Sequence, residues 1–62
     1  MKPYKLIITQ PENSGFILGE YSDFLDAFQA QGDFNKSRYA HETGQRASMY
    51  GTSEDGLYYI GG

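Results

Sequence analysis

The sequence lacks cysteine and tryptophan, and it contains one histidine, His41, among its 62 residues. Without cysteine the chain has no disulfide, no thiolate ligand for a metal and no cysteine nucleophile. His41 is therefore the one imidazole that could act as a general base or as a nitrogen ligand. The neighbouring Glu42 would point to the opposite side of a strand, so the two side chains would not share a metal ion. We expect no enzyme activity, no metal site and no cofactor.

Basic residues and long apolar runs are also scarce. Five Lys and Arg stand against eight Asp and Glu, which gives a net charge of -3. Affinity for nucleic acid comes largely from neutralising phosphates, so this composition disfavours direct nucleic-acid binding. No apolar run approaches the roughly 20 residues that span a bilayer, and the N-terminal residues lack the apolar region of a secretory signal. We therefore expect a cytoplasmic protein that does not bind membranes.

Aromatic residues, in contrast, are abundant: the chain has six Tyr and four Phe. We interpret residues 1–62 as a single small domain, near the lower size limit at which a core stabilises a chain without disulfides or metal. Aromatic side chains must then supply much of the apolar core, or a partner chain must cover part of them. A homodimer is an open alternative on this evidence.

One segment, residues 21–32, has the periodicity of an amphipathic helix. Phe24, Leu25 and Phe28 recur at helical spacing and form an apolar stripe. Ser22 is a favourable N-cap, and Gly32 can adopt the left-handed conformation that ends a helix. The sequence therefore predicts a helix over residues 22–31 that packs on the rest of the fold through this stripe.

The remaining residues favour strands and turns. Residues 4–9 and 16–21 are rich in strand-forming side chains and flank the loop-forming residues 10–15, which predicts an antiparallel hairpin. Two further hairpins are predicted over residues 38–50, with a turn at Thr43 and Gly44, and over residues 50–60, with a turn at Asp55 and Gly56. The predicted fold is α+β: a single helix packed on one face of a four- to five-stranded antiparallel or mixed sheet, in the order β-β-α-β-β-(β).

The two C-terminal hairpins would sort their residues onto the two faces of this sheet. The face that suits contact with the helix is small or apolar and contains Ala40, Ala47, Met49, Gly51, Tyr58 and Ile60. The other face gathers candidates for contact with a partner, namely Tyr39, His41, Arg46, Tyr50 and Tyr59. Tyr and Arg are enriched where protein interfaces gain most of their binding energy. We therefore predict a small non-catalytic protein-binding module, a regulator or inhibitor that occupies the surface of another protein.

Gly61 and Gly62, which follow the last predicted strand, suggest a different function. The order of two strands, one helix and further strands, ending in Gly-Gly, resembles the ubiquitin-like sulfur carriers of the β-grasp kind. That resemblance implies a carrier whose Gly62 carboxylate is adenylated and converted to a thiocarboxylate.

A second alternative uses acidic residues on and beside the predicted helix. These residues are Glu20, Asp23, Asp26 and Asp33. A surface of this charge can dock on a basic, nucleic-acid-binding partner protein.

Overall fold

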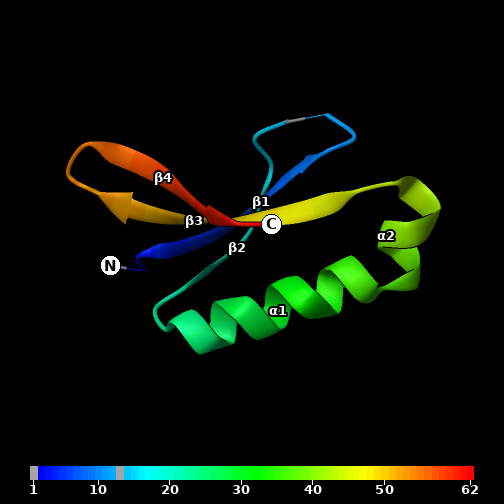
Figure 1. Ribbon diagram of the computed structural model, residues 1–62, viewed down its shortest axis with the longest axis horizontal. Helices are drawn as coiled ribbons and strands as arrows, with labels where there is room; N and C mark the ends of the chain where they lie inside the picture. Colours follow the sequence, from blue (N-terminus) through cyan, green and yellow to red (C-terminus); the bar gives the residue numbers. More distant parts are fainter. Residues whose placement is uncertain (1, 13) are drawn as a thin grey trace.

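The computed structural model describes residues 2–12 and 14–62, and this part of the chain forms four strands and two helices (Figure 1). The strands are β1 (Tyr4–Gln10), β2 (Ile17–Tyr21), β3 (Arg46–Ser53) and β4 (Gly56–Gly61), and the helices are α1 (Phe24–Lys36) and α2 (Arg38–Thr43). The predicted α+β class is confirmed, and a second helix replaces one of the predicted hairpins. Asn13, in the predicted loop over residues 10–15, lies outside the described residues.

The four strands form one antiparallel sheet in the order β2-β1-β3-β4. In the centre of the sheet, Leu6 on β1 pairs with Gly19 on β2 and with Met49 on β3. The predicted hairpin of β1 and β2 is confirmed by this pairing. β2 and β4 are the two edges of the sheet. Both helices lie on the same side of it, with α1 running along the sheet and α2 at one end (Figure 1).

The hairpin of β3 and β4 is also confirmed, although its turn is displaced by one residue. Glu54 and Asp55 form the turn, and Ser53 pairs with Gly56. Gly56 has φ = 115°, a conformation that favours glycine. Moving the turn by one residue changes each cross-strand partner by two positions. Because side chains alternate between the faces of a strand, every residue of the hairpin stays on its predicted face. Tyr50, Thr52, Leu57 and Tyr59 therefore share one face, and Gly51 shares the other with Tyr58.

Residues 38–43 form α2 instead of a strand, so the predicted hairpin over residues 38–50 is wrong. Ser37 is the N-cap: its Oγ atom accepts a hydrogen bond of 3.1 Å from the backbone N–H of Ala40. Gly44, with φ = 71°, ends the helix. The glycine that suggested a hairpin turn is thus a helix-ending glycine. Tyr39 and His41 lie on α2, and Ala40 is buried there and not on the sheet.

α1 begins and ends later than the sequence predicts. Asp23 is the N-cap, in place of Ser22, and its Oδ2 atom accepts a hydrogen bond of 3.4 Å from the backbone N–H of Asp26. The helix passes through Gly32 and continues to Lys36. The predicted stop at Gly32 is wrong, because contacts made by helix residues on both sides of Gly32 outweigh the weak helix propensity of glycine.

Two amide side chains near the end of α1 make those contacts with β3. Asn35 holds the Ala47 peptide from both sides: its Nδ2 donates to the Ala47 carbonyl at 3.1 Å, and its Oδ1 accepts from the Ala47 N–H at 2.8 Å. One turn earlier, Gln31 Nε2 donates to the carbonyls of Ala47 and Gly61, each at 3.1 Å. These bonds satisfy backbone groups beside the register shift between β1 and β3.

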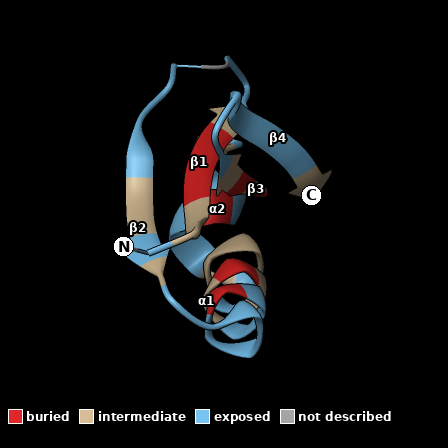
Figure 2. Cartoon of the chain, turned by 90° about the vertical axis from the view of Figure 1, so that its left-hand side faces the viewer, coloured by how far each residue is buried: buried red, intermediate tan, exposed pale blue. Residues whose placement is uncertain are grey.

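The core between α1 and the sheet is small (Figure 2). Leu6, Ala27 and Met49 form its centre, and each is at most 1% exposed. The small side chain of Ala27 faces the sheet, so the larger residues beside it lie on the flanks of the helix. The predicted packing of the apolar stripe against the sheet is therefore wrong: the exposed fractions are 40%, 69% and 60% for Phe24, Leu25 and Phe28.

Candidate functional site

The sheet face opposite α1 is called the open face below. It comprises Lys5, Ile7, Thr9, Ile17, Glu20, Ser48, Tyr50, Thr52, Leu57 and Tyr59. At its β4 edge, Tyr50 on β3 and Tyr59 on β4 are direct cross-strand partners. Their rings meet edge to face, with centroids 5.7 Å apart and an interplanar angle of 74°. Tyr59 is 61% exposed, so one ring of the pair is accessible to a partner protein.

The strand register extends this tyrosine pair into a row across the whole sheet. Lys5 on β1 lies between its two partners, Tyr50 on β3 and Glu20 on β2. The row is thus aromatic at β4 and charged at β2. Leu57 lies two residues before Tyr59 on the same face and is 50% exposed. Protein interfaces likewise combine aromatic and aliphatic contact area with adjoining polar and charged residues.

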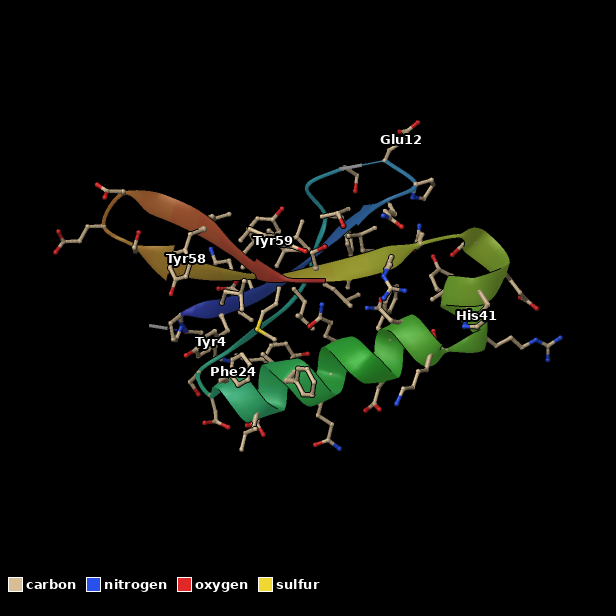
Figure 3. All side chains as sticks on the ribbon, in the orientation of Figure 1. Tyr4, Glu12, Phe24, His41, Tyr58 and Tyr59 are labelled. Atoms are coloured by element: carbon tan, nitrogen blue, oxygen red, sulfur yellow. The ribbon has the colours of Figure 1, made fainter. Side chains whose placement is uncertain are left out.

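The other three predicted contact residues lie elsewhere. Tyr39 and His41 are on α2, and Figure 3 shows His41 at the opposite end of the molecule from Tyr58 on β4. Their predicted place on a sheet face is wrong because residues 38–43 are helical. Arg46 begins β3, beside a register shift, and its side chain lines a groove next to α1.

That groove, called the α1–β4 groove below, has a volume of ≈ 480 Å³ and lies between α1 and β4. Its apolar end is lined by Phe24 and Phe28, whose rings stack with centroids 6.0 Å apart, and by Ile60 of β4. In Figure 3 Phe24 lies beside Tyr4, at the start of α1. The other end of the groove, where α1 ends and β3 begins, is basic and is lined by Lys36 and Arg46.

The α1–β4 groove is not predicted from the sequence, because the periodicity places Phe24 and Phe28 in the core. The small side chain of Ala27 between them was the available signal. A helix that lies close to a sheet needs a small residue at its point of contact, and larger neighbours are then displaced to the sides.

The two glycines of the carrier hypothesis are both held against the fold. Gly61 is the last residue of β4, and its carbonyl accepts the hydrogen bond from Gln31. Gly62 lies against Ser48, since a Cβ atom at position 62 would meet the Ser48 side chain. A carrier tail has to enter the pocket of an activating enzyme, so this arrangement would require the end of β4 to detach.

The predicted acidic surface is divided between two parts of the molecule. Glu20 lies on the open face, where it is the cross-strand neighbour of Lys5. Asp23 and Asp26 lie at the start of α1, and Asp33 follows two turns later on the same side of the helix as Asp26. The four carboxylates therefore do not form one continuous surface.

A scan against protein-family models, a search of curated proteins and a search of solved structures found no match to this chain. Within residues 2–12 and 14–62, no three potential metal-ligating side chains lie together. No helix in these ranges is long and apolar enough to cross a membrane. Function is therefore inferred from the open face and the α1–β4 groove.

Proposed function

We propose that this protein is a small non-catalytic binding module that covers the surface of a partner protein with its open face. The observation that carries the proposal is the cross-strand pair of Tyr50 and Tyr59, in which Tyr59 is exposed, with the exposed Leu57 beside it. Tyrosine offers a large, rigid contact area and a hydroxyl group that can form a hydrogen bond, and few rotamers are lost when it binds. A partner whose functional site lies under this face is blocked by occupancy alone, without a chemical step.

The exposure of apolar side chains supports the same proposal. Among the described residues, nine large apolar or aromatic side chains are at least 40% exposed, and Ile17, Leu57 and Tyr59 of this group lie on the open face. Leu57 and Tyr59 are neighbours on β4, whereas Ile17 lies on β2 at the opposite edge, so the β4 side of the open face carries the exposed apolar surface that commonly marks an interaction site. A standard interface of roughly 800 Å² per partner would take about a fifth of the 4304 Å² accessible surface, which one broad side of the sheet can supply.

Replacing one tyrosine on the open face and, separately, one on α2 tests this proposal. We expect Tyr59→Ser to weaken partner binding by about 30-fold or more, the loss of roughly 2 kcal/mol that defines an interface hot spot. Tyr39→Ser is the matched control, because Tyr39 is 57% exposed but lies on α2. The partner is captured from the native host with the tagged wild-type chain, and its affinity for each variant is measured by biolayer interferometry.

Circular dichroism establishes that both variants are folded before their affinities are compared. Unchanged binding of Tyr59→Ser, or an equal loss in both variants, contradicts contact through the open face.

A further inference from the structure

β4 is an edge strand that has little of the protection edge strands usually carry. It lies at one edge of the sheet. In the described part of the chain, Ser53 Oγ donates a hydrogen bond to its Gly56 carbonyl and Gln31 Nε2 donates one to its Gly61 carbonyl, each at 3.1 Å. The strand contains no charged residue and no proline. Its register shifts only near its end, between Tyr59 and Gly61. Native proteins guard edges with charge, proline or bulges, and an unguarded edge can pair with another strand.

The opposite edge of the sheet, β2, is guarded. It has five residues, it carries the charged Glu20, and its register shifts between Ile17 and Gly19, in the middle of the strand. The exposed backbone of β2 is therefore short and irregular. This difference between the two edges directs strand pairing to β4.

We propose that β4 pairs antiparallel with β4 of a second copy of this chain, which joins two four-stranded sheets into one of eight strands. Two identical antiparallel strands are related by a twofold axis, so the same backbone groups are used on both sides. Among the registers that keep both open faces on one side, the one centred on Tyr58 pairs residues 56–60, with Leu57 opposite Tyr59, and leaves out Gly61, whose carbonyl Gln31 already binds. The proposal concerns the edge of the sheet, and it therefore goes beyond the function proposed for the open face.

Charges at the two ends of β4 identify the second copy as the occupant. The exposed Glu54 and Asp55 form the turn before β4, whereas Lys36 and Arg46 line the end of the α1–β4 groove beside Gly62. Antiparallel pairing brings the acidic turn of each copy to the basic groove end of the other, twice per dimer. β4 is uncharged, so the strands themselves do not repel one another. The β3–β4 hairpin therefore complements the α1–β4 groove: its acidic turn matches the basic end of the groove, and its apolar strand β4 matches the apolar end.

The same pairing accounts for the apolar end of the groove. Two β4 strands would lie side by side between two α1 helices, with an α1–β4 groove on each side. Phe28 and Tyr58, which are 60% and 51% exposed in one chain, would then border a strip that both copies share. An apolar surface that is exposed in the single chain is thus brought into the centre of the dimer.

Charge reversal tests the arrangement in solution. Analytical ultracentrifugation should detect a species with twice the 7.0 kDa mass of one chain. Glu54→Arg and Arg46→Glu should each raise the dissociation constant of the dimer about tenfold, because each places like charges together at two symmetric contacts, and the double variant should restore it. Glu12→Arg is the matched control, since Glu12 is an exposed acid on the connection between β1 and β2, away from β4 (Figure 3).

Disulfide formation tests the register. Directly opposite residues of antiparallel strands have Cα atoms about 4.5–5.5 Å apart, within the range that a disulfide bridges. The chain has no cysteine, so Tyr58→Cys introduces a single thiol that should give a covalent dimer on mild oxidation. Leu25→Cys, at a position 69% exposed on α1, should give no covalent dimer under the same conditions.

A chain that is monomeric at every concentration measured, or a dimer that neither charge reversal weakens, overturns the proposal. So does a covalent dimer that forms from Leu25→Cys and not from Tyr58→Cys. A monomeric chain whose groove captures an acidic, extended peptide also overturns it, because the groove would then serve a different partner. If the chain is monomeric and Tyr59→Ser still weakens binding of the host partner, the dimer is overturned and the function proposed for the open face stands.

Discussion

Asn35 binds the Ala47 peptide through both its amide nitrogen and its amide oxygen, as a neighbouring strand would. We expect Asn35→Ala to lower the free energy of unfolding by about 1–3 kcal/mol, because the Ala47 N–H would lose its partner in a partly buried place. Urea denaturation measures this change. Gln29→Ala, at an exposed position of the same helix, is the control for helix propensity. An equal effect of both substitutions would show that the amide bonds contribute little.

Gly51 provides the space in which the ring of Tyr58 lies. A Cβ atom at position 51 would overlap the Cζ and Oη atoms of that ring. We expect Gly51→Ala to destabilise the fold by about 1–3 kcal/mol, as overpacking commonly does. Combining it with Tyr58→Ser should cost less than the sum of the two single substitutions, since the overlap disappears with the ring. Additive losses in thermal unfolding would contradict this packing.

At the scale of elements, the start of α1 is set by one side chain. Asp23→Ala should lower the free energy of unfolding by about 1 kcal/mol, the usual loss when an N-cap is removed. Ser22→Ala should change it by less than about 0.5 kcal/mol, because Ser22 precedes the cap and is exposed. Chemical denaturation of both variants compares them directly. A larger loss for Ser22→Ala would move the start of the helix back to Ser22.

The strands were predictable from the sequence because the signals that define them are local. Alternation defines β1, and the turn residues Glu54 to Gly56 define the hairpin of β3 and β4. The same hairpin places Tyr50 and Tyr59 on one face of the sheet, as the sequence predicts, although their direct pairing depends on a turn one residue earlier than predicted.

The helices were less predictable because distant contacts decide them. Gly44 suits a hairpin turn as well as the end of a helix, and the cap made by Ser37 and the burial of Ala40 select the helix. In α1 the periodicity favours burial of the phenylalanines, whereas Gln31 and Asn35 turn a different face toward the sheet. The α1–β4 groove results from that rotation, so local pattern alone could not predict it.

At the scale of the whole molecule, a small core supports two extended apolar surfaces. Leu6, Ala27 and Met49 form the centre of the core, while large apolar side chains remain exposed on α1 and on β4. A chain that binds partners only in its folded state is stabilised by each of them through mass action. The chain can bind a partner protein through the open face and a second copy through the edge of β4 at the same time. The open face is a broad side of the sheet, whereas the β4 edge is its rim.

Photo-crosslinking from the open face tests partner binding most directly. A benzophenone amino acid is placed at position 59, where the side chain is 61% exposed on the open face, or at position 39, where it is 57% exposed on α2. Both variants are irradiated in the native host, and the adducts are identified by mass spectrometry. Binding through the open face predicts one host protein joined to position 59 and absent from position 39. An adduct of that protein with position 39 and not with position 59 contradicts it.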